Sequence, residues 1–231
     1  MKYARLGILG GTFDPIHYGH LDAAEAARAT LELDEVLFIP AHDPPHKSQD
    51  PRASAFHRFA MVTLAIQDCP GYRASDMELD REGASYTADT LRALHRRGFE
   101  PARLFFILGA DAFADIAAWR EFPAILDLAH FVVVARPGTT LDEAMARTPH
   151  LRTRARSSPP ALRDGDGDAG MGIYLVEART RDVASTAVRA RLAEGAPIDE
   201  LVPRPVARQI VAHYLYGAVG DRHGQDQGTA G

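Results

Sequence analysis

The sequence predicts one α/β domain built on a doubly wound parallel sheet with helices on both faces. Apolar runs of strand length alternate with helical patterns along most of the chain, and such alternation is typical of parallel strands joined by right-handed helical crossovers. The length of 231 residues suits a single domain of this class. Hydrophobic residues make up 46% of the chain and charged residues 25%, which is an ordinary globular composition.

Six apolar segments are predicted to be strands. The segments at 104–108 and 131–134 are continuous runs of aliphatic and aromatic residues, as expected for strands that are buried on both faces. The first strand leads directly into two glycines, and the second is closed by Pro40. In chain order, the predicted strands span residues 3–9, 35–39, 72–79, 104–108, 131–134 and 173–176.

The segments between these strands carry helical signals. The first is rich in alanine, and the second places Phe56, Phe59 and Leu64 on one side of a helix. Gly98 is expected to end the third helix, and Pro123 interrupts the fourth. The predicted helices span residues 22–31, 54–67, 87–97, 112–128, 185–194 and 205–216.

Two segments depart from this alternation. Residues 148–172 contain three prolines, four arginines and the string DGDGD, and are predicted to form a long mobile loop. This string is not an EF-hand, because Ala169 and Leu175 stand where that loop needs Gly and Glu. Residues 220–231 are polar and glycine-rich, which predicts a disordered tail. The remaining residues, 1–219, are predicted to form one Rossmann-like domain.

Charge and cysteine content exclude several classes of protein. The formal net charge of −5 argues against general attraction to nucleic acid, and no apolar run is long enough to span a membrane. The single cysteine, Cys69, rules out an internal disulfide and fits a reducing compartment. The apolar run within residues 1–9 is too short for a secretory signal. We therefore expect a cytoplasmic protein without nucleic-acid or membrane partners. The sequence leaves open whether the protein forms a homo-oligomer.

The residues after the first predicted strand have the features of a phosphate-binding site. The string GGTFDP occupies residues 10–15, and HYGH follows at residues 17–20, near the expected start of the first helix. Glycines let backbone N–H groups approach an anion, and a helix N-terminus adds a favourable dipole. His17 and His20 can face the same anion. Open α/β sheets also bind their ligands beyond the carboxyl ends of the strands.

These two strings resemble the signature of the nucleotidyltransferase superfamily, a (G/S)(T/S)F(D)P loop followed by an HxGH box. Four further strings narrow the resemblance to the bacterial nicotinate mononucleotide adenylyltransferases. They are PPHK at 44–47, SYTADTL at 85–91, GAD at 109–111 with Trp119, and STAVR at 185–189. They occur in the order of that family, and the resemblance covers about residues 3–216. The chain departs from the family at Ala184, where a serine is usual.

The resemblance implies roles for individual residues. His17 and His20 would hold the triphosphate, and these two with Arg189 are expected to be catalytic. ATP binding is expected of Gly10, Gly11, Thr12, Phe13, His17, His20, Lys47, Gly109, Asp111, Ser185, Thr186 and Arg189. Substrate binding is expected of Asp14, Tyr86, Thr87 and Trp119.

Several of these residue types also suit such roles on physical grounds. The flexible ammonium group of Lys47 can reach a phosphate, and the carboxylate of Asp111 can accept hydrogen bonds from a ribose. Thr87 can cap a helix whose first N–H groups bind a carboxylate. Trp119, the single tryptophan, offers a face on which a pyridinium ring can stack. The segment that starts at Ser185 combines hydroxyl, N–H and guanidinium donors for a polyphosphate.

The expected reaction is the transfer of AMP from ATP to nicotinate mononucleotide, which gives deamido-NAD and pyrophosphate in NAD biosynthesis. The acceptor phosphate is already ionised, so positioning and charge stabilisation would supply the catalysis. His42, His46 and Lys47 lack the spacing of a zinc site. No protein-held metal is expected, and Mg²⁺ is expected to arrive with ATP.

Other activities remain open on the sequence. Nicotinamide mononucleotide differs from the expected acceptor only in its ring substituent. Phosphopantetheine adenylyltransferases usually have Thr in place of His17, and cytidylyltransferases lack the string at 85–91. A dehydrogenase is disfavoured because residues 7–11 do not match G-x-G-x-x-G. A nucleotide-sensing module without catalysis also stays open.

Overall fold

A single parallel sheet organises the computed structural model, which describes residues 5–44, 51–81, 83–135, 141–158 and 170–218. Its seven strands follow the order β3-β2-β1-β4-β5-β7-β6. The strands are β1 (Leu6–Gly11), β2 (Glu35–Pro40), β3 (Tyr72–Ala74), β4 (Leu104–Gly109), β5 (His130–Ala135), β6 (Ala155–Arg156) and β7 (Ile173–Glu177). The chain order of the strands reverses between β1 and β4. Ligands of doubly wound sheets bind at this reversal.

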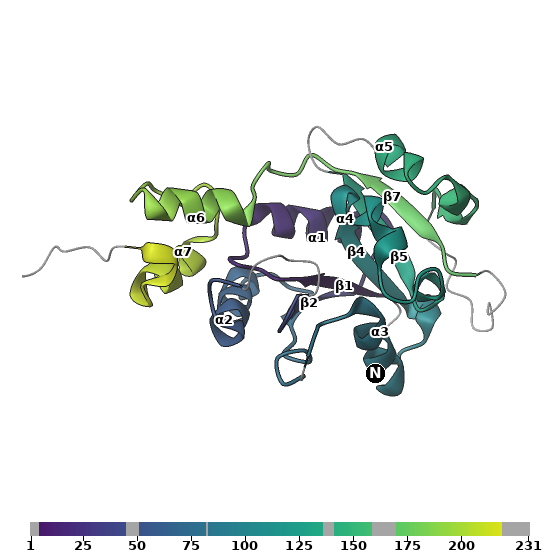
Figure 1. Cartoon of the computed structure of the whole chain (residues 1–231), viewed down its shortest axis with the longest axis horizontal. Coiled ribbons are helices and arrows are strands. Elements are labelled where there is room, and N and C mark those ends of the chain that lie inside the picture. The colour runs from purple at the N-terminus through teal and green to yellow at the C-terminus, as the bar shows by residue number, and fades with distance from the viewer. Residues whose placement is uncertain (1–4, 45–50, 82, 136–140, 159–169, 219–231) are drawn as a thin grey trace, which may run out of the picture.

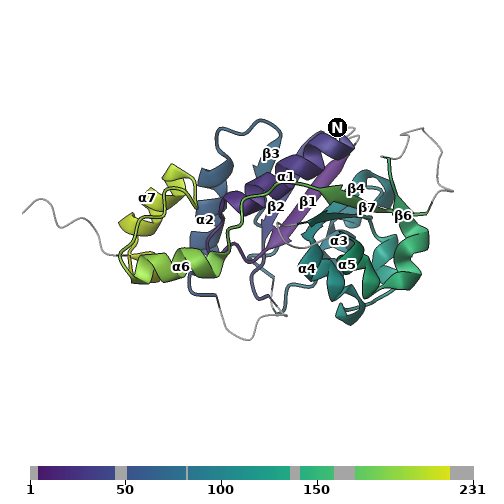
Figure 2. The same cartoon turned by 90° about the horizontal axis from the view of Figure 1, so that it is seen from above.

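Helices cover both faces of the sheet, as the sequence predicts (Figures 1 and 2). One face packs against α1 (Tyr18–Leu31) and α2 (Ala55–Ile66), and side chains of α6 (Ser185–Ala193) and α7 (Arg204–Ala212) join the same core. The other packs against α3 (Thr87–Arg96), α4 (Ala110–Ala114) and α5 (Leu141–Ala146). Two hydrophobic cores form because neighbouring side chains of β1 point to opposite faces of the sheet. Leu9 belongs to the first core, on the side of α1, and Leu6 and Ile8 belong to the second core, on the side of α3.

Two predicted elements are shorter than expected. The strand predicted at 72–79 ends at Ala74, because the next residues turn. There the Leu79 amide donates to the carbonyl oxygen of Asp76, and the Met77 amide to the Ser75 hydroxyl. The helix predicted at 112–128 is instead α4, followed by the 3₁₀ turns η2 (Ile116–Ala118) and η3 (Ala124–Asp127).

The segment predicted to be a long mobile loop, 148–172, has regular structure in its first part. Its first part forms the 3₁₀ turn η4 (Pro149–Arg154) and strand β6, which pairs with β7. Leu151 anchors this part because its side chain is buried in the second core. The rest of the predicted loop includes residues 159–169, which lie outside the described residues, as does the predicted tail at 220–231.

The first helix begins four residues earlier than predicted. Tyr18 is its first residue and His17 its N-cap, so the HYGH string forms the start of α1.

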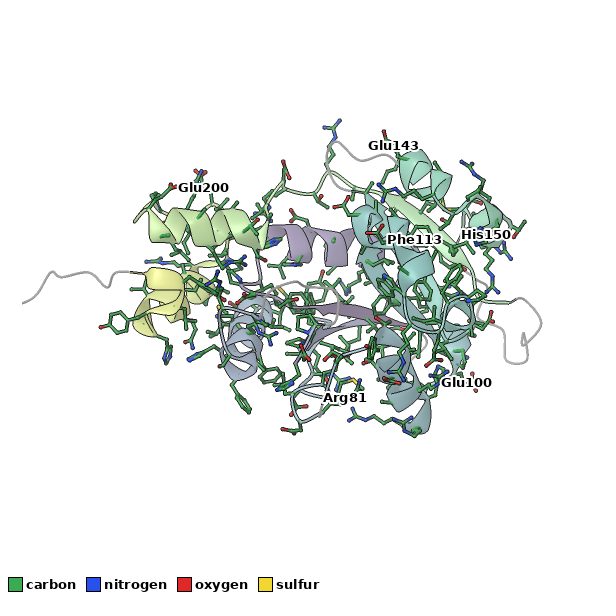
Figure 3. All side chains as sticks on the ribbon, in the orientation of Figure 1. Arg81, Glu100, Phe113, Glu143, His150 and Glu200 are labelled. Atoms are coloured by element: carbon green, nitrogen blue, oxygen red, sulfur yellow. The ribbon has the colours of Figure 1, made fainter. Side chains whose placement is uncertain are left out.

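The side chains labelled in Figure 3 illustrate the burial pattern, since Phe113 lies inside the second core whereas His150 lies at the periphery. None of the helices in the described part of the chain is long and apolar enough to cross a membrane.

Candidate active site

A cleft of about 390 Å³ opens at the carboxyl ends of β1 and β4, where the strand order reverses. Its lining combines apolar side chains with few polar groups, as small-molecule sites usually do. Ten of the residues singled out in the sequence line it: Gly10, Gly11, Thr12, Phe13, His17, His20, Thr87, Gly109, Trp119 and Ser185. The tertiary structure thus brings most of the predicted site together.

The two histidines of the HYGH string form a stacked pair at the start of α1. Their ring centroids lie 3.7 Å apart, with the ring planes inclined by 27°. The backbone N–H of His17 donates to Nδ1 of His20 over 3.2 Å. Because Nδ1 of His20 accepts this bond, the neutral ring carries its proton on Nε2. His20 therefore has a second ring nitrogen that can donate to an anion.

Gly19 lies where the packing around this pair leaves little room for a side chain. A Cβ atom at this position would lie 3.2 Å from Nδ1 of His17 and 3.2 Å from the carbonyl oxygen of Arg181. Both distances are tighter than nearly all contacts that real Cβ atoms make. The glycine between the histidines thus lets the segment after β7 approach the start of α1.

Asp14 is held inside the protein. Its carboxylate accepts hydrogen bonds from the backbone N–H groups of Arg52 and Ala53 at 2.9 and 3.0 Å, and from the Tyr216 hydroxyl at 2.8 Å. The side chain is buried and does not line the cleft. These bonds fix the loop after β1 to the segment before α2. The predicted contact of Asp14 with the substrate stays a prediction, and the geometry gives it a structural role.

Arg58 connects the loops that follow β1 and β2. This side chain is only 1% exposed, and its guanidinium donates to the carbonyl oxygens of Thr12 at 2.7 Å, Ala41 at 2.6 Å and His42 at 3.1 Å. Burial lowers its pKa, and the nearby charge of Asp14 opposes that shift. No sequence motif pointed to Arg58. Its signal is a charged residue on the apolar stripe of α2, in phase with Met61 and Val62.

The start of α6 reaches the loop after β1 from the opposite end of the chain. The Ser185 hydroxyl donates to the carbonyl oxygen of Pro15 over 3.0 Å, and Arg189 donates to that of Asp14 over 2.7 Å. Thr186 is exposed, and neither it nor Arg189 lines the cleft. The bonds of Ser185 and Arg189 therefore support the loop after β1 in this structure, and the predicted polyphosphate contacts stay predictions.

One end of the cleft combines an aromatic face with a helix start. Trp119 is half-buried and packs edge-on against Phe106, with the ring centroids 6.0 Å apart. Thr87 is the first residue of α3, and Tyr86 rather than Thr87 is the N-cap. The Tyr86 side chain makes no capping hydrogen bond. Instead, its ring lies beneath the Arg120 guanidinium, 4.6 Å from it, and does not line the cleft.

A buried carboxyl group lies beside this helix start. Glu78 lines the cleft and is 6% exposed. The Thr90 hydroxyl donates to its Oε1 atom and lies 3.4 Å from the carbonyl oxygen of Tyr86. Burial raises the pKa of Glu78, whereas the Thr90 hydroxyl and the Arg81 charge act in the opposite direction. The sequence analysis did not single out Glu78.

The other end of the cleft is lined by the segment after β7. Thr180, Arg181 and Val183 line the cleft, as does Ala23 of α1. The Arg181 guanidinium donates to both carboxylate oxygens of Asp22 at 2.9 and 2.7 Å, and it lies 3.8 Å from the centre of the Tyr18 ring. The hydrogen bond from Arg181 lowers the pKa of Asp22. This double contact fixes the segment against α1.

Asp111 and Lys47 complete the set of predicted site residues. Asp111 lies in the first turn of α4 and is exposed; it is not itself a lining residue, although Gly109 and Ala112 on either side of it are. Lys47 lies outside the described residues. Their predicted roles in ATP binding stay predictions.

Comparison with known proteins agrees with this geometry. The cytidylyltransferase-like family model matches residues 8–191. A probable nicotinate-nucleotide adenylyltransferase of a Roseiflexus species is 46% identical over 216 residues, which are 94% of this chain and 100% of the relative. One of Citrifermentans bemidjiense is 42% identical and covers 92% of this chain and 98% of its own.

Solved structures share the fold. The nicotinic acid mononucleotide adenylyltransferase of Plasmodium falciparum, complexed with APC, superposes with a TM-score of 0.67 at 18% identity, over 93% of this chain and 98% of its own. The same enzyme complexed with NaAD gives the same TM-score over 92% of this chain and 97% of its own. The sequence relatives and the matched family model show that the chain belongs to the nicotinate-nucleotide adenylyltransferase family, within the cytidylyltransferase-like proteins.

Proposed function

We propose that this protein transfers AMP from ATP to nicotinate mononucleotide and releases pyrophosphate, with deamido-NAD as the other product. One observation carries the proposal: a single cleft joins the stacked pair His17 and His20 to Trp119 and the start of α3. The first feature suits a triphosphate, and the second suits a pyridinium ring that carries a carboxylate. The adenylyltransferase names of the relatives support the same reaction.

In this mechanism the acceptor phosphate attacks the α-phosphorus of ATP in line, and the bond to pyrophosphate breaks. The chain contributes alignment and charge stabilisation rather than a nucleophile. His20 donates from Nε2 to the phosphate oxygens, because its Nδ1 already accepts the His17 amide. His17 stacks on His20 and, as the N-cap of α1, lies where backbone dipoles favour negative charge.

Magnesium enters the proposal as part of the substrate, MgATP. Mg²⁺ usually keeps several waters and binds through substrate phosphates. In the described ranges, no group of three or more His, Cys, Asp or Glu side chains is placed to hold a metal ion. We also propose that the protein works in the cytoplasm, a setting that suits the free thiol of Cys69.

The test measures pyrophosphate release from ATP with each of three acceptors in parallel: nicotinate mononucleotide, nicotinamide mononucleotide and phosphopantetheine. We expect turnover with nicotinate mononucleotide to exceed that with the other two by far. Turnover with phosphopantetheine alone would overturn the proposal, and so would the absence of pyrophosphate with all three.

A further inference from the structure

The turn that carries Trp119 is tied to α3 by an ion pair. This turn, residues 119–123, joins the 3₁₀ segments η2 and η3. The Arg92 guanidinium of α3 donates through two nitrogens to the two carboxylate oxygens of Glu121, and its Nη1 lies 2.6 Å from Oε1. A bidentate pair of this kind fixes the orientation of the two groups as well as their distance. The hydrogen bonding from Arg92 also lowers the pKa of Glu121, so the carboxylate stays ionised at neutral pH.

The neighbouring residue Arg120 makes a second connection to the same helix. Its Nη1 donates to Oδ2 of Asp89 over 3.2 Å, and its guanidinium lies 4.6 Å from the centre of the Tyr86 ring at the start of α3. Isolated surface ion pairs contribute little, but a bidentate pair that belongs to a network is an exception. We call the contacts of Arg120 and Glu121 with α3 the clamp.

The backbone of Glu121 supports a role for its side chain. Its φ of 68° lies in the left-handed region, which residues with a Cβ atom rarely adopt and which costs them free energy. A glycine would take this conformation without that cost. The glutamate therefore supplies something that the turn by itself does not need, and the pair with Arg92 is what it supplies.

The hydrophobic core anchors both sides of the turn but not its middle. Ile116 before the turn and Ile125 after it are buried, and so are Ala88 and Leu91 of α3. The Trp119 side chain between them is only half-buried. Loss of the clamp should therefore release the turn and leave α3 and the flanking core in place.

We propose that the clamp positions the acceptor: it holds the Trp119 ring at a fixed distance from the start of α3 before the mononucleotide arrives. Thr87 of α3 and Trp119 both line the cleft, so the clamp sets the width of the space for the pyridinium ring. This inference rests on the proposed function, since it assigns that end of the cleft to the mononucleotide. Arg92, Arg120 and Glu121 are positioning residues. They act through Trp119 and not on the reacting atoms.

The effect of the clamp should be confined to acceptor binding. The histidine pair is held by contacts of its own at the start of α1, namely the stacked rings and the bond from the His17 amide to His20. Without the clamp, the turn must be ordered when the acceptor binds, and that cost weakens acceptor binding. Because the cost is the same in the ground state and the transition state, it raises the acceptor KM and leaves kcat nearly unchanged.

The kinetic test removes the two connections separately and together. Glu121→Gln removes one charge of the ion pair, and Arg120→Ala removes the other contacts with α3. We expect each to raise the KM for nicotinate mononucleotide about threefold and the double variant about tenfold, with kcat and the KM for ATP changed less than about twofold. Asp127→Asn is the matched control, because this carboxylate pairs with Arg154 over 2.7 Å and lies in η3, the next segment of the chain.

Arg92→Gln tests the ion pair from its other side. It should raise the acceptor KM as much as Glu121→Gln does. The combination of these two substitutions should have no larger effect than either alone, because both break the same contact. Additive effects would show that the two side chains act independently and would overturn the assignment of the pair.

A second readout does not depend on activity. Trp119 is the single tryptophan of the chain, so its fluorescence reports on this turn alone. In the free enzyme, we expect the acrylamide quenching constant of this fluorescence to rise about twofold in the double variant with Arg120→Ala and Glu121→Gln. It should not change in Asp127→Asn. Circular dichroism checks that each variant is folded at the assay temperature, and the two single variants carry the same tests if the double variant is not.

Equal increases in the KM values for both substrates would overturn the inference, and so would unchanged acrylamide quenching without the clamp. The proposed function is judged separately, by wild-type turnover. If the wild-type enzyme used neither pyridine mononucleotide, the proposed function would fail and the role of the clamp toward an acceptor would fail with it. The quenching constants would then decide whether the clamp still holds the turn.

Discussion

The Tyr216 hydroxyl donates a 2.8 Å hydrogen bond to Oδ1 of Asp14, which lies 202 residues earlier in the chain. Burial and the Asp14 charge raise the pKa of Tyr216 far above its usual value, so the phenol keeps its proton and remains a donor. The bond fastens the segment after α7 to the loop that follows β1. The C-terminal part of the domain thus helps to shape the phosphate loop.

Removing this hydroxyl should destabilise the protein. Tyr216→Phe leaves one lone pair of Asp14 without its donor, so we expect the free energy of unfolding in urea to fall by about 1–3 kcal/mol. Tyr214→Phe is the control, because that side chain is 72% exposed and its change should stay within about 0.5 kcal/mol. Equal effects of the two substitutions would contradict the role of Tyr216.

The histidine pair should act on the chemical step. Contacts that strengthen as charge develops lower the barrier, and losing one such donor typically reduces the rate by about 10²–10³. We expect His17→Ala and His20→Ala to lower kcat by this factor and to change the KM for ATP much less. Steady-state kinetics check this, with the exposed His150→Ala as control. Near-wild-type kcat in both variants would remove these residues from catalysis.

Trp119 should contribute to acceptor binding. A stacking platform is worth about 1–3 kcal/mol per ring when it is replaced by alanine. We therefore expect Trp119→Ala to weaken nicotinate mononucleotide binding by at least about fivefold in calorimetry while ATP binding stays nearly constant. Trp119→Phe keeps the contact with Phe106 and an aromatic face, so it should lose less. Equal losses for both ligands would instead indicate a core role.

Ring specificity should follow from the start of α3. A carboxylate gains charge-assisted hydrogen bonds from backbone N–H groups, whereas a carboxamide loses that charge and places an NH₂ against donors. We expect kcat/KM for nicotinate mononucleotide to exceed that for nicotinamide mononucleotide by at least about 10²-fold, or about 2.7 kcal/mol. Comparable values of kcat/KM would show that this helix start does not distinguish the two rings.

Stability should fall in mild acid because of His130. This ring is 3% exposed, its Nδ1 accepts the Gly172 amide over 2.9 Å, and burial lowers its pKa to about 4. An unfolded histidine titrates near pH 6.5, so between these values the unfolded chain binds more protons than the folded one. The contribution of His130 is present above about pH 6.5 and is lost as the pH falls toward 4.

At pH 5 this loss amounts to about 2 kcal/mol. Urea unfolding of the wild type and of His130→Asn at pH 7.5 and pH 5 measures it. Asn can still accept the Gly172 amide but does not titrate in this range. The variant should therefore lose less stability on acidification, and identical losses would count against His130.

Local sequence patterns predicted the fold class and the main part of the candidate site. The alternation of apolar runs with helical segments needs only neighbouring residues to be read, and the sheet confirms it. The phosphate loop and the histidine pair are also contained in one βα turn, residues 10–20. The ends of strands and helices were predicted less well. After β3 a turn that begins at Ser75 ends the strand early, and after α4 short 3₁₀ turns take the place of a continuous helix.

The roles of buried polar side chains were decided only by the tertiary structure. The Asp14 carboxylate is held by Ala53 and Tyr216, and Arg189 donates to the backbone of Asp14; the motifs did not indicate these bonds, and the expected contacts of Asp14 with the substrate and of Arg189 with the phosphates stay predictions. Arg58 and Glu78 had no assigned role at all. A buried polar group must find its partners wherever the fold brings them, and the bonds that hold Asp14 span 38 to 202 residues of sequence. Periodicity and motif spacing describe residues that are neighbours along the chain. Contacts between distant segments, and the acceptor to which each hydroxyl or guanidinium donates, therefore follow only from the packed structure.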